Sequence, residues 1–503
     1  MAGGYLCCQA FFIACMKMVE LRCGRCFGLD YSWAHLAVMA VTICVVLAGG
    51  LYAAKSVHSA EGFSLGGRSA GIPMILGSIA GTCVGGGATV GTAQLAGSVG
   101  LSAVWFTIGI GFSLLVMGII YARPLRYTGL ETISQYLVVN YGKGAGRFTS
   151  FVTSLGILFS AVASTLPGIG LLTALTGYSY LTSAGLLLVL VILYAFFGGM
   201  KTASVGGLLK MIILFVTLFA LGITAWHGLL AEPMLLADKP VDFLSIWRIG
   251  TGSILNNVVS VLVGIICTQT YIQAIFSAAT PKTAAAGLMI ASLVAIPIGV
   301  PCALMGIYMQ AVHPELPAMM ALPAYLLHYA SPLMGGAALG GIVLGIIGSI
   351  AGLSLGVGTM VARDMLEPLL PIRSEQGKLM LMRLSVVGAV LVAMYIAIAY
   401  KDSQILFWNY LSMALRGCGV FMPLTLAIFK PRALSPAWAL ASMVLSLGAA
   451  IAAGLCYIDS SPIFIGLGVS MVVVLLGLIR KRLHPRNPEV RRTDVLDIVG
   501  KQQ

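Results

Sequence analysis

The sequence has 503 residues, of which 59% are hydrophobic and only 9% are charged. A soluble domain carries about 25% charged residues, so a water-soluble fold of this length is excluded and lipid must be the surrounding solvent. The net charge of +13 lies in short clusters between apolar runs, a distribution typical of membrane topology and not of a nucleic-acid-binding surface.

Thirteen apolar segments are long enough to cross a bilayer as helices, which takes about 20 residues each. They predict an all-α polytopic protein of a cell membrane, either a plasma membrane or a bacterial inner membrane. In chain order the predicted spans are 32–54, 70–97, 101–122, 148–175, 180–198, 206–230, 250–278, 284–311, 333–362, 380–400, 404–429, 435–457 and 462–480.

The basic residues predict the orientation, because cytoplasmic loops are enriched in Lys and Arg. With the N-terminus outside, the outer loops hold only Lys239, Arg248 and Lys401. The inner loops hold fourteen basic residues: Lys55, Arg68, Arg123, Arg126, Lys143, Arg147, Lys201, Lys282, Arg363, Arg373, Lys378, Arg383, Lys430 and Arg432. The C-terminus is therefore expected in the cytoplasm.

Three regions divide the chain. Residues 1–31 form a Cys-rich N-terminal extension, 32–480 a transmembrane transporter domain, and 481–503 a basic cytoplasmic tail. In the extension, Cys23 and Cys26 have half of a zinc-site spacing without a second pair. A peripheral extension and a signal peptide both remain open for this region.

Glycines interrupt the second span, which reads GTCVGGGATVGTAQLAG at 81–97. A glycine costs roughly 1 kcal/mol relative to alanine inside a helix, and lipid cannot satisfy freed backbone groups. The run at 85–87 therefore predicts a broken helix that offers carbonyls to a cation and N–H groups to an anionic substrate. The alternative is close helix packing through small residues. Thr89, Thr92 and Gln94 follow the break and either line a cavity or bond to local backbone.

Several motifs, in order, resemble the solute:sodium symporter family: GFSLGGRSAG at 62–71, the glycine-rich run at 81–97, GLSAVWFTIG, FGGMKTA at 197–203, GSIAGLSLGVGTMVARD at 348–364, and the Pro423 region. The resemblance covers residues 32–480. It implies a LeuT-type five-plus-five inverted repeat made of spans two to six and seven to eleven. The first helix of each repeat is broken in that fold. In span seven the candidate weak points are Asn256, Asn257 and Gly264.

The resemblance also implies a sodium site, which this sequence matches only in part. The positions of the backbone ligands are Gly81, Val84 and Gly345, and of two expected hydroxyls only Ser349 remains, because Gly348 has no side chain. A hard cation requires oxygen ligands, so a weak sodium site is expected. The positions that match a second site are Gly207, Ala351 and Gly352, and that site is expected to be absent. Cys83 stands where some members have an acidic residue.

Lys210 lies three residues after Gly207, so both are expected on one face of the sixth span. Its ammonium is a candidate to occupy the lost sodium's position and to cycle a proton, because a buried Lys changes protonation state readily. The alternative is a Lys that extends to the cytoplasmic interface.

Arg416 lies near the middle of the eleventh span, where an Arg costs at least about 2.5 kcal/mol. No Asp or Glu lies in the central part of any predicted span. Arg416 either binds an anionic substrate through its planar fork or caps carbonyls of broken helices. The predicted substrate-binding residues are Gly85, Gly86, Gly87, Thr89 and Arg416. Glu131, Asp364 and Glu367 are expected in loops beside Arg126 and Arg363.

These features predict a secondary active transporter that performs cation-coupled symport of a small organic solute, a carboxylate or a zwitterion. No cofactor is expected, and the coupling ion is a proton or sodium, with proton coupling or sodium-independent transport favoured. Two alternatives stay open: a sodium-dependent symporter with one weakened site, and a transporter-like membrane sensor. No intramembrane constellation of catalytic residues is found, so an enzyme is not expected. The lipid bilayer and the solute are the expected partners, and the oligomeric state stays open.

Overall fold

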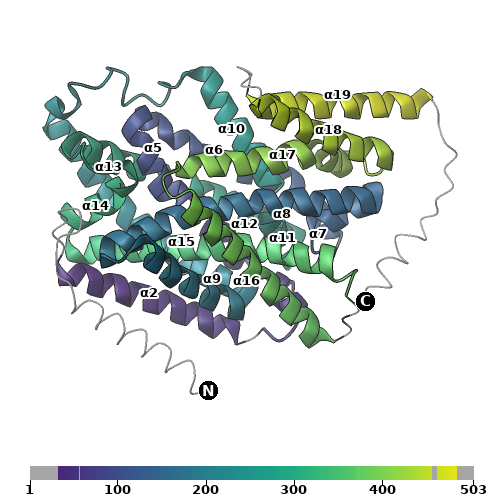
Figure 1. Cartoon of the computed structure of the whole chain (residues 1–503), viewed down its shortest axis with the longest axis horizontal. Coiled ribbons are helices and arrows are strands. Elements are labelled where there is room, and N and C mark those ends of the chain that lie inside the picture. The colour runs from purple at the N-terminus through teal and green to yellow at the C-terminus, as the bar shows by residue number, and fades with distance from the viewer. Residues whose placement is uncertain (1–31, 56, 371, 373, 456–460, 484–503) are drawn as a thin grey trace.

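The computed structural model describes residues 32–55, 57–370, 372, 374–455 and 461–483. The predicted extension at 1–31 and the tail beyond Leu483 lie outside these residues. Figure 1 shows a bundle of long helices in which α2 lies along one edge and α18 and α19 along another. The main helices are α2 (Trp33–Ala54), α4 (Ile72–Cys83), α5 (Thr92–Val99), α6 (Trp105–Val116), α8 (Ile133–Thr176), α9 (Tyr180–Ala231), α10 (Gly250–Ile266), α11 (Gln269–Ser277), α12 (Pro281–Ala295), α13 (Gly299–Val312), α14 (Ala321–His328), α15 (Pro332–Met360), α16 (Glu375–Ala399), α17 (Ile405–Phe429), α18 (Pro436–Leu455) and α19 (Pro462–Leu483).

The predicted all-α membrane fold is confirmed, but the count of thirteen spans is not. Each predicted segment coincides with a helix or with consecutive helices. Within the described residues, ten helices are long and apolar enough to cross a membrane, or eleven when α10 and α11 form one bent span. The counts differ because some spans are broken into shorter pieces, as in α4 with its 12 residues.

Two long helices change direction at glycines with positive φ. In α8 this residue is Gly142 (φ 84°), and in α9 it is Gly199 (φ 51°). Glycine adopts positive φ without the steric penalty of a Cβ atom. Gly199 therefore separates the predicted fifth and sixth spans, although hydrogen bonding continues across the junction.

The predicted break in the second span is confirmed. Helix α4 ends at Cys83, and Val84 adopts a non-helical conformation (φ −91°, ψ 78°). The chain becomes helical again in a short π-helix, η1 (Gly87–Gly91), which continues into α5. The break therefore occupies 84–86, where the glycine run begins.

Span seven is also broken, three residues beyond one of its candidate weak points. Helices α10 and α11 meet at 49°, and the two residues between them are Cys267 and Thr268. The hydroxyl of Thr268 donates to the Gly264 carbonyl at 2.7 Å, which supports the turn. Asn256 and Asn257 lie inside α10, so predicting a break there was wrong.

Close packing through small residues sets the distance between α4 and α9. A Cβ atom on Gly81 would lie 2.6 Å from the Gly207 Cα, so the two backbones are in direct contact. Small residues allow this approach in membrane helices. Helix α15 packs against both α4 and α9, and its central part is completely buried. The break in α4 thus lies at the junction of three helices.

Candidate substrate and cation site

Lys210 lies at the junction of α4, α9 and α15. Its side chain is only 1% exposed. The ammonium nitrogen Nζ donates to the Gly81 carbonyl at the end of α4 and to the Gly345 carbonyl on α15 at 3.1 Å. Lys210 therefore points into the bundle and not toward the membrane surface, and it joins three helices through one charged group.

Packing of its own helix places Lys210 there. Gly207, one turn earlier on α9, is in contact with Gly77 and Gly81 of α4, so the same face of α9 directs Lys210 at the break. On α15, a Cβ atom at Gly348 would lie 3.0 Å from Nζ. The ammonium thus lies beside the position at which the resemblance implies a missing hydroxyl.

The other predicted cation-coupling residues are close by. Ser349 is 1% exposed, and its hydroxyl donates to the Thr82 carbonyl at 2.6 Å. A Cβ atom at Gly345 would lie 3.6 Å from the Val84 carbonyl oxygen. The structure therefore brings Gly81, Val84, Gly345, Ser349 and Lys210 together.

These groups do not fit a sodium ion well. Two of the predicted carbonyl ligands, on Gly81 and Gly345, already accept hydrogen bonds from Lys210. Gly207 and Gly352 add no side-chain oxygen, and across the part of the chain that the structure describes no cluster of three His, Cys, Asp or Glu side chains is found. A hard cation needs several oxygen ligands, and the ammonium uses half of the predicted set.

Arg416 is the second buried cation, with 2% of its surface exposed. Its Nε donates to the Gly264 carbonyl at 2.9 Å, near the bend between α10 and α11. Its Nη1 donates to the hydroxyls of Ser412 at 2.9 Å and Ser160 at 3.3 Å. No carboxylate lies within ion-pair distance of Arg416 or Lys210 among the described residues. Arg416 therefore caps a broken helix and also keeps an uncompensated charge.

Close contact between α8 and α17 positions this guanidinium. A Cβ atom at Gly156 would lie 3.2 Å from the Arg416 Cβ, and Ser412 donates to the Gly156 carbonyl. The hydroxyls of Ser160 and Ser412 are 2.7 Å apart. These bonds fix the α17 face that carries Arg416 against α8.

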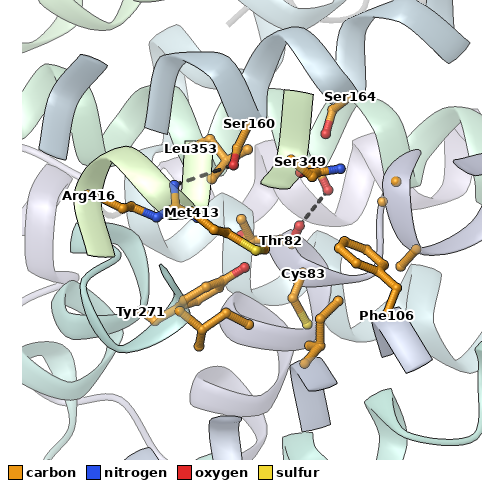
Figure 2. Close-up of a pocket in the computed structure, with 16 residues that line it drawn as sticks. Thr82, Cys83, Phe106, Ser160, Ser164, Tyr271, Ser349, Leu353, Met413 and Arg416 are labelled. Atoms are coloured by element: carbon orange, nitrogen blue, oxygen red, sulfur yellow. Dashed lines mark hydrogen bonds between the residues drawn. The ribbon is translucent and has the colours of Figure 1, made fainter. Parts of the chain in front are cut away.

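A cavity lies between these helices, and Figure 2 shows Arg416 and Phe106 on opposite sides of it. Its volume of about 30 Å³ is room for about two waters, so a solute would require helix movement. Apolar atoms come from Phe106, Ile110, Ile265, Leu353 and Met413. The main polar lining residues are Ser160, Ser164, Tyr271, Ser349, Asn409 and Arg416.

Three of the five predicted substrate-binding residues line this cavity: Gly85, Gly87 and Arg416. Gly86 instead packs against α8, where a Cβ atom added at this position would lie 2.5 Å from the Pro167 ring. The Thr89 hydroxyl donates to the Gly85 carbonyl at 2.9 Å. Of the two alternatives for Thr89, the structure therefore has the bond to local backbone. Gly86 and Thr89 therefore do not line this cavity, and their part in substrate binding stays a prediction.

Thr92 and Gln94, the other two candidates after the break, are not cavity residues either. Thr92 is fully buried in α5, and the Gln94 side chain accepts from the Ile405 backbone N–H at 3.4 Å. The Gln94 side chain therefore caps the backbone at the start of α17 and does not line the cavity.

Asn409 and Tyr271 also line the cavity, although neither was predicted from the sequence. Asn409 could have been found from helical spacing, because it lies on the same α17 face as Ser412, Met413 and Arg416. Tyr271 follows the bend of span seven, and no local pattern marks its direction. Only the packing of α11 against its neighbours directs this side chain to the cavity.

Ion pairs at one end of the bundle link the start of α8 to the end of α15. Arg363 pairs with Glu131 at 3.0 Å and with Glu367 at 3.2 Å. Arg126 contacts none of the predicted acidic partners and donates to the Ala278 carbonyl at 2.6 Å. Asp364 lies in a π-helix, η6 (Val361–Leu366), so placing it in a loop was wrong. It accepts from the Thr132 hydroxyl at 3.1 Å.

Comparison with known proteins gives one family match. A model described as the sodium:solute symporter family matches residues 63–446. High-affinity choline transporter 1 of Drosophila melanogaster is 27% identical over 205 residues, which cover 40% of this chain and 33% of that protein. The human protein of the same name is 26% identical over 293 residues, covering 54% and 49%. The chain thus spans about half the length, or less, of the curated relatives that it matches.

Solved structures confirm the LeuT-type fold. A Na⁺-coupled sialic acid symporter in a substrate-bound outward-open state aligns with a TM-score of 0.78 at 18% identity, covering 92% of this chain and all of the other. The nucleobase-cation-symport-1 transporter Mhp1 in a closed conformation aligns with a TM-score of 0.54 at 12% identity, covering 83% and 93%. At these identities the likeness concerns the fold alone.

Proposed function

Because this chain belongs to the sodium:solute symporter family, we propose that it is a secondary active transporter for a small organic carboxylate or zwitterion, with Lys210 in place of a sodium ion. One observation carries the proposal. Two buried cations, Lys210 and Arg416, lie at the break of α4 and on the cavity wall without a carboxylate partner among the described residues.

The contacts of Lys210 support coupling that does not depend on sodium. The protonated ammonium holds carbonyls of α4 and α15 together, which is the role that the resemblance gives to sodium. A Lys can release its proton in a buried site, whereas an Arg cannot. Loss of the proton weakens both bonds, so proton binding and helix movement become linked.

The charge of Arg416 supports an anionic substrate. An unpaired buried cation is costly, and a carboxylate can accept two parallel bonds from a guanidinium. The curated relatives are named as choline transporters, but choline is a cation and would meet Arg416 in the cavity wall. We therefore expect choline to be a poor substrate for this chain.

A sodium-dependent symporter with a weakened site is the second candidate. The Val84 carbonyl and the Ser349 hydroxyl remain beside the break, so two oxygens of the implied site are still in place. Transport that requires sodium would favour this candidate over proton coupling.

Ligand binding by the purified full-length protein tests the proposal. A ligand that binds the folded state raises the melting temperature, so we would compare pyruvate, lactate, 4-aminobutanoate and choline, and each acid with its amide. We expect stabilisation by at least one carboxylate, little by its amide, and no requirement for sodium.

Two variants test whether Arg416 is responsible for carboxylate binding. Arg416→Lys should lose most of the affinity, because an ammonium cannot reproduce the two-point contact. Ser160→Ala removes the 3.3 Å bond to Arg416 and the 2.7 Å bond to Ser412. It leaves the bonds of Arg416 to Gly264 and Ser412 in place, so it should keep most of the affinity. Equal binding of acid and amide, or unchanged binding by Arg416→Ala, would show that Arg416 is only a helix cap.

A further inference from the structure

Asn409 is a buried amide that the proposed carboxylate contact leaves unused. It lies on α17, is 8% exposed and lines the cavity. Within the described part of the chain its side chain makes no hydrogen bond. A Cβ atom on Gly87 would meet its Nδ2, so the amide lies beside the break of α4. Buried side-chain amides are nearly always hydrogen-bonded, which points to a partner that comes from outside the chain.

Asn409 and Arg416 are placed to act together. They are seven residues apart on one face of α17, about 10 Å along the helix axis. Met413 lies between them on the same face and also lines the cavity. Ser412, the other residue of this face, is used to hold Arg416 and α8. The cavity thus has a charged polar group and a neutral polar group, with apolar surface between them.

From this arrangement we infer that Asn409 is a second substrate-binding residue, which recognises a neutral hydrogen-bonding group opposite the carboxylate. The inference rests on the proposed function, since Arg416 is taken to bind the carboxylate. The substrate class is then a short-chain acid whose far end carries a hydroxyl, carbonyl or amide group. The Asn amide both donates and accepts, so it matches each of these groups.

The charges near Asn409 explain why the substrate group opposite the carboxylate should be neutral. Lys210, the other cation near the break, donates to the carbonyls of Gly81 and Gly345 and is not among the residues that line the cavity. A second carboxylate would therefore be buried at Asn409 without a cation to pair with, which is costly. A quaternary ammonium would meet no acidic side chain there, since the residues lining the cavity include no Asp or Glu.

A matched series of probes tests the inference on the full chain in detergent. We would measure the dissociation constants of unbranched acids with three to six carbons, and of the same acids with a terminal hydroxyl group. At the chain length that fits, we expect the hydroxy acid to bind at least about tenfold more tightly than its parent. No preference for a hydroxy acid at any length would overturn the inference.

Two α17 variants locate the effect. Asn409→Leu keeps the approximate size of the side chain and should remove the preference for the hydroxy acid. Tyr410→Phe is the matched control and should keep the preference. The Tyr410 hydroxyl is buried and has no hydrogen-bond partner among the described residues, and the residue does not line the cavity. A preference that survives in Asn409→Leu, with an unchanged melting temperature in the absence of ligand, would overturn the inference.

The amide of the best hydroxy acid separates this inference from the proposed function. If the acid and its amide bind equally, while the hydroxyl preference still depends on Asn409, then the carboxylate role of Arg416 fails and the role of Asn409 stands. If the acid is required but the hydroxyl preference is absent, the proposed function stands and the inference fails.

Discussion

Gly348 and Lys210 face each other across the contact between α15 and α9, where a Cβ atom on Gly348 would lie 3.0 Å from the Lys210 Nζ. The two residues are complementary: one has no side chain and the other extends a buried ammonium into the adjacent space. The loss of a hydroxyl at 348 and the presence of a Lys at 210 are therefore two parts of one arrangement.

This relationship makes the effect of Gly348→Ser depend on residue 210. With Lys210 present, the added serine should not create sodium dependence, because the ammonium still occupies the Gly81 and Gly345 carbonyls. In the double variant Lys210→Ala with Gly348→Ser, those carbonyls and two hydroxyls become free for a cation. We expect sodium, but not potassium, to raise the melting temperature of the double variant only. Sodium stabilisation of the single variant Gly348→Ser would contradict the arrangement.

Substitution of Lys210 should separate coupling from transport. Lys210→Ala should abolish accumulation against a gradient in liposomes and keep exchange of substrate across the membrane. Lys210→Arg should also fail to accumulate substrate, because Arg does not deprotonate in proteins. The measurement is uptake of a labelled carboxylate with an imposed pH gradient, compared with an imposed sodium gradient. Wild-type accumulation in both variants would show that Lys210 is structural.

The contact between α4 and α9 should tolerate no added methyl group at Gly207. A Cβ atom there would meet the Gly77 carbonyl and lie 3.0 Å from the Gly81 Cα, and both are backbone atoms that cannot turn away. We expect Gly207→Ala to destabilise the fold by about 1–3 kcal/mol and to displace Lys210. Gly185→Ala on the same helix is the control, since nothing lies within 4 Å of its Cβ position. Equal melting temperatures of the two variants would show that the contact is loose.

The distribution of basic residues predicts the orientation in the membrane. A reporter that fluoresces only in the cytoplasm, fused after Gln503, should be active, because the loops assigned to that side carry most of the Lys and Arg. The matched control is the same reporter inserted after Asp238, in the loop that carries Lys239, where it should be silent. The reverse pattern would invert the topology.

The sequence alone determined the features that depend on local chemistry. Composition identified the membrane fold, and the glycines at 85–87 located the break of span two, because helix propensity and backbone hydrogen bonding are properties of neighbouring residues. The spacing of Gly207 and Lys210 placed both on one face of α9 for the same reason. The likeness of the motifs to a known family supplied the LeuT-type arrangement.

Only the tertiary structure decided which of these residues meet. Lys210 and Gly345 are separated by 135 residues, and Arg416 and Gly264 by 152, so no local pattern relates them. The bend at Cys267 and Thr268 has neither Gly nor Pro at its turn. Gly86 and Thr89 belong to the predicted break, yet packing against α8 and a bond within the helix direct them away from the cavity. Asn409 and Tyr271 enter the cavity because α17 and α11 pack beside it, and that packing depends on long-range contacts across the whole bundle.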